Sequence, residues 1–207
     1  YPSLKITGEV GKLLPVLDEI LLNSGWIKAF TGTNTASYRS GTGSNQRYYW
    51  INDAGLTTGS FRNAAIRGYS AMTGATDTGT NPFPTSAQLT QGAVIRKSNT
   101  LDTVAREWYA IVSERFCYLF IASGETAGVY NPYCFGDFNS YKALETRNSY
   151  VAAYTADATS FTPGNYGVLR IENFYNNTPT AGNYVAGDCN TGAVYDTGSG
   201  KDISRGM

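Results

Sequence analysis

The chain has 207 residues, enough to bury one sizeable core, and its 16 basic residues are balanced by 16 acidic ones. That balance excludes the strong uniform field with which proteins hold nucleic acids or anionic membrane surfaces. Only 15% of the residues are charged, against about 25% in an average globular protein, so Ser, Thr, Asn, Gly and the 16 tyrosines must cover much of the surface, which favours contact with neighbouring proteins.

The first element predicted along the chain is an amphipathic helix at about residues 12–22. Its apolar stripe recurs at spacings of three and four residues and consists of Leu13, Leu14, Leu17, Ile20 and Leu21. Pro15 fits the first turn, and Gly25 is placed to end the helix.

After the helix, short β-type runs alternate with clusters of Gly, Asn, Thr and Pro. The predicted strands cover residues 26–30, 37–39, 47–52, 63–72, 93–97, 108–112, 116–122, 150–154 and 168–172. Such spacing is typical of an antiparallel sandwich or an irregular barrel. We therefore predict a mainly β fold with one N-terminal helix and long loops, forming a single domain over residues 1–172.

The clearest hairpin joins residues 108–112 to residues 116–122 through a short polar turn. We expect it in the middle of the core, with Trp108, Tyr118 and Phe120 buried. The run 116–122 is also the longest apolar run, far short of the roughly 20 residues that a membrane helix needs. No basic segment followed by an apolar one precedes it at the start of the chain, so we expect a soluble protein without a targeting segment.

Several predicted loops are long, and they cover residues 32–45, 73–91 and 124–143. Long loops in compact domains usually bind something or are ordered by a neighbour. Residues 173–207 are rich in Gly, Asn, Thr and Asp. We predict that they form an extended C-terminal arm, mobile in the isolated monomer and ordered against a second protein chain.

The composition offers little for catalysis. No histidine is present, which removes the commonest general base, the commonest metal ligand and every Ser-His or Cys-His pair. The sequence has no phosphate-binding P-loop and no dinucleotide fingerprint. Cys117, Cys134 and Cys189 match neither a zinc pattern nor a disulfide framework, and we interpret them as small buried residues of a protein assembled in a reducing cytosol. We expect no catalytic, cofactor-binding or metal-binding residue and no enzymatic activity.

A few acidic residues are the remaining candidates for chemistry. A glycosidase needs two carboxylates across a cleft, and Glu107, Asp137 and Glu172 are possible members, although no pattern selects a pair. Asp137 is better interpreted as a turn residue between two phenylalanines. Asp77 lies in a loop rich in oxygen ligands that lacks the alternating acids of a calcium loop, so we interpret it as a cation-free turn.

A series of segments, in a consistent order, resembles a family of virion proteins from tailed bacteriophages and prophages. The resemblance covers roughly two thirds of the chain. The segments are Leu-Leu-Pro-Val-Leu-Asp-Glu-Ile-Leu-Leu-Asn-Ser-Gly-Trp at 13–26, Ala-Phe-Thr-Gly-Thr-Asn at 29–34, Ala-Ser-Tyr-Arg at 36–39, Arg-Tyr-Tyr-Trp-Ile-Asn-Asp at 47–53, Ala-Ile-Arg-Gly-Tyr at 65–69, Thr-Gly-Thr-Asn-Pro-Phe-Pro at 78–84, Lys97-Ser98, Trp108 and Phe-Gly-Asp-Phe at 135–138.

This resemblance implies a structural component of the virion, assembled in the cytoplasm of the host bacterium. The favoured expectation is a capsid decoration or cement protein that binds the head lattice and stabilises it. Its partners would be the major capsid protein or other virion proteins, in a homo-oligomer or symmetric array, with no nucleic acid and no membrane. The second expectation is a protein of the tail, collar or baseplate.

A third expectation belongs to a different class, a carbohydrate-binding or glycan-cleaving β-domain. In that case Trp26, Trp50 or Trp108 would form an exposed platform for sugar rings, together with tyrosines. Exposed tryptophans would support this alternative, and buried ones would remove it.

Overall fold

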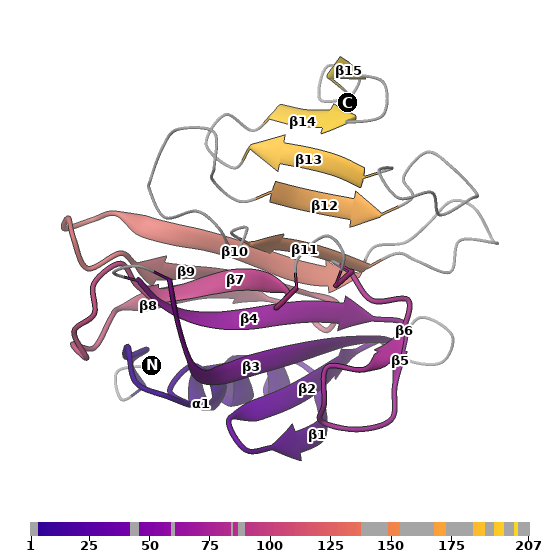
Figure 1. Cartoon of the computed structure of the whole chain (residues 1–207), viewed down its shortest axis with the longest axis horizontal. Helices are drawn as coiled ribbons and strands as arrows, with labels where there is room; N and C mark the ends of the chain where they lie inside the picture. Colours follow the sequence, from indigo (N-terminus) through magenta and orange to yellow (C-terminus); the bar gives the residue numbers. More distant parts are fainter. Residues whose placement is uncertain are drawn as a thin grey trace.

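The computed structural model describes residues 4–41, 46–58, 61–83, 85–86, 90–137, 149–153, 168–172, 184–188, 193–196 and 201–202. The fold is mainly β, as predicted, with its strands in three antiparallel sheets. The two larger sheets pack face to face as a sandwich and do not close into a barrel (Figure 1).

One face of the sandwich is a five-stranded sheet with the strand order β1-β2-β3-β4-β7. Its strands are β1 (Ile27–Gly32), β2 (Thr35–Ser40), β3 (Arg47–Thr58), β4 (Phe61–Tyr69) and β7 (Ala93–Ser98). The centre of this sheet is buried on both faces, because a short hairpin of β5 (Ala71–Met72) and β6 (Gly79–Thr80) lies beside it. Trp50, Tyr69 and Met72 form a small second core there.

The other face is an eight-stranded sheet in which the strands follow one another from β8 to β15. Its strands are β8 (Trp108–Val112), β9 (Phe116–Ala122), β10 (Tyr130–Asp137), β11 (Ser149–Ala153), β12 (Val168–Glu172), β13 (Tyr184–Asp188), β14 (Ala193–Asp196) and β15 (Lys201–Asp202). Strands β12 to β15 extend the sheet at the top of Figure 1.

Most strand predictions agree with the structure, but some regions differ. The predicted loop at 73–91 contains the short strand β6. The predicted strand at residues 63–72 is divided into β4 and β5 by Ser70. The predicted loop at 124–143 contains β10. Pro132 and Gly136 are uncommon inside strands, so the sequence of this segment did not indicate one. Within the predicted arm the structure describes β13, β14 and β15, and the rest of the arm lies outside the described residues. The domain boundary at residue 172 stays a prediction.

Aromatic side chains hold the two sheets together. The rings of Tyr49 on β3 and Phe135 on β10 lie 5.3 Å apart, and the Tyr49 hydroxyl donates a hydrogen bond to the Gly136 carbonyl. A second link joins β10 to β7, where the Arg96 amide donates to the Tyr133 hydroxyl over 2.8 Å. These cross-sheet contacts fix the spacing of the sandwich.

The predicted helix at residues 12–22 is present as α1 (Leu14–Leu17), which continues into the wider π-type turn η1 (Asp18–Leu22). The buried side of this helix carries Leu13, Val16, Leu17, Ile20 and Leu21. It packs at one end of the sandwich against β1 and β8. The chain then turns at Gly25, whose φ of +88° suits a residue without a side chain.

The hairpin of β8 and β9 has the predicted bounds, but two expectations about its burial are wrong. β8 is an edge strand of its sheet, so the hairpin does not lie in the middle of the core. The buried side chains of β9 are Cys117, Leu119 and Ile121, whereas Tyr118 is 40% exposed and Phe120 is half-buried. Side chains alternate between the two faces of a strand. The prediction placed the aromatic side chains of β9 in the core, and this choice put the whole strand in the wrong orientation.

This register can be tested by comparing Leu119→Ala with Tyr118→Ala. Removing the buried Leu119 side chain should lower the free energy of unfolding by about 2–5 kcal/mol, because a cavity remains in the core. Removing the Tyr118 side chain should cost below about 1 kcal/mol, because the ring is partly in water. Both values come from urea denaturation, and an equal or inverted loss would contradict the observed register.

Candidate protein-interaction surface

The residues considered for carbohydrate or metal chemistry do not come together in the described part of the chain. Glu107 is exposed and forms an ion pair with Lys5 at 3.6 Å. Asp137 and Glu172 end β10 and β12, and their side chains lie outside the described set. Within the described residues, no group of three or more Cys, Asp or Glu side chains is placed to hold a metal ion.

Asp77 has a structural use in the hairpin loop above the five-stranded sheet. Its carboxylate accepts a hydrogen bond from the Tyr69 hydroxyl at 2.5 Å, and Arg67 Nε lies 3.3 Å away. Burial and the Asp77 carboxylate together raise the pKa of Tyr69 above its usual range, so the phenol stays a hydrogen-bond donor. These contacts hold the loop onto the sheet.

Two of the three tryptophans cannot form a platform for sugar rings. Trp26 is 3% exposed and Trp50 is 6% exposed. The Trp26 indole donates to the Ser113 carbonyl over 2.6 Å, and the Trp50 indole donates to the Ala75 carbonyl over 2.9 Å. The expectation of a sugar platform is therefore wrong for these two residues, and only Trp108 keeps a partly exposed ring.

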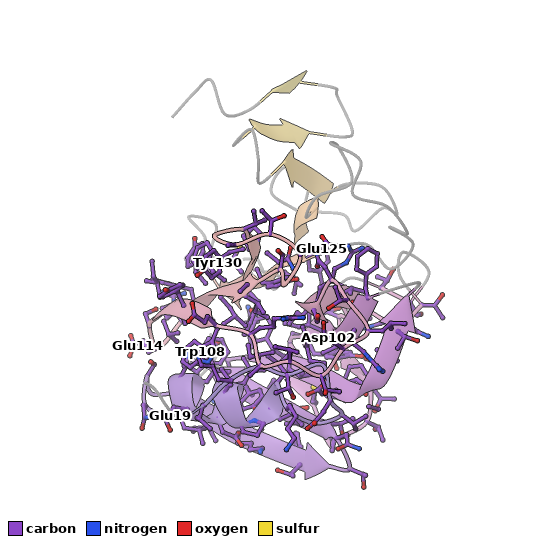
Figure 2. All side chains as sticks on the ribbon, turned by 90° about the vertical axis from the view of Figure 1, so that its left-hand side faces the viewer. Glu19, Asp102, Trp108, Glu114, Glu125 and Tyr130 are labelled. Atoms are coloured by element: carbon purple, nitrogen blue, oxygen red, sulfur yellow. The ribbon has the colours of Figure 1, made fainter. Side chains whose placement is uncertain are left out.

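A group of exposed and partly exposed apolar side chains lies instead on the outer face of β8, β9 and β10. We call this surface the β8–β10 face; its residues are Tyr109, Ile111, Phe116, Tyr118, Phe120 and Tyr130. The strand register places Tyr109 opposite Phe120 and Ile111 opposite Tyr118. Tyr109 is 59% exposed and Ile111 is 62% exposed. Figure 2 labels Tyr130 and the neighbouring Trp108 and Glu114 on this side of the molecule.

The same surface ends at an open strand edge. Ala122 donates its amide hydrogen to the Glu107 carbonyl, and Ser113 donates its amide hydrogen to the Phe116 carbonyl. The backbone groups at the odd-numbered positions of β8 therefore bond to β9. By alternation, the backbone groups of Trp108, Ala110 and Val112 point away from β9. Among the described residues, the bridge between Ile6 and Arg106 is the single pairing on that side, and it lies just before the strand begins.

A groove of about 530 Å³ lies along this open edge. It runs between β8, the N-terminal residues and η1, and Trp108 donates its indole hydrogen to the Leu4 carbonyl over 2.8 Å. The lining residues are Leu4, Lys5, Glu19, Ile20, Asn23, Ser24, Glu107, Trp108, Tyr109, Ala110 and Val112. A strand or peptide backbone could therefore approach β8 without displacing the core.

In the part of the chain that the structure describes, the open edge has no charged side chain, proline or bulge of its own to block pairing with other chains. Edge strands are commonly blocked by charged side chains, proline or a bulge. β1, at the edge of the other sheet, has both Lys28, paired with Asp18 at 2.9 Å, and a bulge between Lys28 and Phe30. β8 has the sequence Trp-Tyr-Ala-Ile-Val, with no charge and no proline. The arrangement is therefore suited to binding a protein surface or an added strand.

No protein-family model, no curated protein and no solved structure matches the chain. None of the helices that the structure describes is long and apolar enough to cross a membrane.

Sequence reasoning missed the β8–β10 face, although a signal for it was present. In residues 116–122 aromatic and aliphatic side chains alternate, which predicts two different faces of one strand. Which face points inward depends on the opposite sheet, and the sequence of the hairpin does not contain that information.

The role of Trp108 in shaping the groove can be tested with Trp108→Phe. The substitution keeps an aromatic ring but removes the hydrogen bond to Leu4, so the free energy of unfolding should fall by about 1 kcal/mol. Hydrogen exchange of the amides near Lys5 should also become faster. Unchanged stability together with unchanged exchange would show that Trp108 does not anchor the N-terminal segment.

Proposed function

We propose that this chain is a non-enzymatic structural protein of a bacteriophage virion, specifically a decoration or cement protein that binds and stabilises the head lattice. The observation that carries the proposal is the coincidence of an exposed apolar face with an uncharged, open edge strand. A freely diffusing protein normally avoids both features, because they promote association.

Energetics support a role in an array more than a role in a single contact. Fully burying one large apolar side chain contributes about 1.5–3 kcal/mol, and association itself costs at least about 4 kcal/mol in lost freedom of motion. A few side chains such as Tyr109, Ile111 and Tyr118 therefore give a modest contact. Several such contacts on a repeating lattice add up by avidity.

The composition and the resemblance described above support the same proposal. Low charge and abundant tyrosine suit a protein packed among neighbours, and the resemblance is to virion proteins. The partners would be the major capsid protein, other virion proteins or further copies of this chain. The proposed location is the virion, and the proposal involves no cofactor, nucleic acid or membrane.

Glycan binding has less support from the site. Trp108 lines a groove with polar residues, but its indole hydrogen is already used by Leu4, and the other two tryptophans are buried. A screen of the protein against host-surface glycans would test this alternative directly, and binding that depends on Trp108 would favour it.

The proposal predicts that Ile111→Ser weakens attachment to particles. If Ile111 is buried in the contact, its loss should weaken binding per copy by about tenfold, which corresponds to about 1.4 kcal/mol. The matched control is Ile27→Ser, which alters an isoleucine that is 48% exposed on β1, at the edge of the other sheet. The measurement is the occupancy of each purified variant on particles that lack the protein.

Equal occupancy of both variants would contradict the proposed surface. Cryo-electron microscopy of the same particles would also locate the protein. Density on the head lattice is expected, and density confined to the tail, collar or baseplate would contradict the decoration role.

A further inference from the structure

Lys97 and Asp53 form a charged pair that is completely removed from water. Both side chains are 0% exposed, and Lys97 Nζ lies 2.5 Å from Asp53 Oδ1. The pair lies among the apolar residues of the main core, where Ile51 and Ile95 precede the two charged residues on the same strand faces. Such a pair is expensive to bury, so its close approach calls for a chemical explanation.

Two bulges, one on each side of β4, place these side chains together. The first bulge is on β3, where Asn52 pairs with Ala65 of β4 and Leu56 pairs with Asn63. Three residues of β3, beginning with Asp53, therefore lie opposite a single residue of β4. The second bulge is on β7, where Arg96 and Ser98 pair with neighbouring residues of β4 and Lys97 is the extra residue between them. Bulges re-aim side chains, and here they bring an amine and a carboxyl group from β7 and β3 to one point.

The two oxygens of the carboxyl group have different surroundings. Oδ2 accepts a hydrogen bond from the Leu13 amide at 2.7 Å. Oδ1 makes no well-directed hydrogen bond within the described residues, although Nζ is so close. Lys97 Nζ donates to the Glu9 carbonyl at 2.5 Å, which holds the amine in place.

We propose that Lys97 and Asp53 are joined by an intramolecular isopeptide bond that the folded protein forms by itself. The neutral amine attacks Cγ of the protonated carboxyl group, so that the Nζ–Cγ bond forms and the Cγ–Oδ1 bond breaks. Oδ1 leaves as water, taking its own proton and one proton from the amine. Oδ2 becomes the amide oxygen and keeps its hydrogen bond to Leu13. The reaction needs no oxidant, reductant or cofactor.

The surroundings favour the neutral amine, the protonated carboxyl group and the charge that develops on Oδ2 during attack. Transfer of one proton within the pair gives a neutral amine and a neutral acid, which a site without water favours over two charges. Burial raises the pKa of the Asp53 carboxyl, although Lys97 and the backbone amides of Leu13 and Leu14 oppose that rise. The Leu13 amide at Oδ2 is placed to stabilise the negative charge that develops there during attack.

The two reacting groups are in contact and shielded from solvent. The fold holds the reacting groups in contact, which replaces a bimolecular encounter by an intramolecular one. The buried site excludes water, so the amide is protected from hydrolysis once the leaving water has escaped. The resulting bond would connect β3 to β7 across β4 and hold these three strands together under load.

Mass spectrometry of the full-length protein under denaturing conditions tests the bond. The intact mass should be lower than the sequence mass by one water molecule. Trypsin should release a branched peptide in which residues 48–62 are joined to residues 97–106, because cleavage after a modified Lys97 is blocked. An intact mass equal to the sequence mass, with normal cleavage after Lys97, would overturn the proposal.

Two controls make the result specific. A linear 48–62 peptide that lacks one water would indicate ring closure of Asp53 onto the next backbone amide, and would also overturn the proposal. The double variant Asp53→Leu with Lys97→Met removes both charges and avoids an unpaired one, so it should fold and have its full sequence mass. The partly exposed pair of Lys28 and Asp18 in the same digest should remain unlinked.

Discussion

The buried pair of Lys97 and Asp53 is the contact on which the first half of the fold depends. It connects three parts of the chain, because Lys97 donates to the Glu9 carbonyl and Asp53 accepts from the Leu13 amide. The Asp53 carbonyl also accepts a hydrogen bond from the Gly11 amide at 2.8 Å. The N-terminal segment is thereby fixed to the sheet immediately before the helix begins. Loss of one partner would leave an unpaired buried charge, at a cost of about 3–5 kcal/mol.

The position of the helix explains why β8 can remain an open edge. The helix fills the end of the sandwich between β1 and β8, so the inward side chains Trp108, Ala110 and Val112 pack against the core. The edge strand is therefore anchored by its inner face and by β9, and among the described residues no strand pairs with Trp108–Val112 on the other side. Asp18 strengthens the anchor by accepting a hydrogen bond from the Tyr38 hydroxyl at 2.9 Å. The result is an apolar edge strand without a charged residue or a proline.

Local patterns in the sequence were sufficient for the helix and for most strands, since both depend on periodicity. β10 was missed because Pro132 and Gly136 are poor strand residues, and their pairing with β9 is determined by tertiary contacts. The buried face of β9 was assigned wrongly because burial depends on the opposite sheet. The ion pair was also missed, although Asp53 and Lys97 follow their buried neighbours with a period of two. A charged residue in phase with a buried face is the signal that could have found it.

The central claim is that the open edge of β8 and the β8–β10 face contact another protein in the particle. Hydrogen exchange of the Trp108, Ala110 and Val112 amides, measured in the free and the particle-bound protein, tests it most directly. These amides point away from β9, so they should exchange quickly in the free protein and become protected on binding. Equally fast exchange in both states, with protection gained elsewhere on the molecule, would contradict the account.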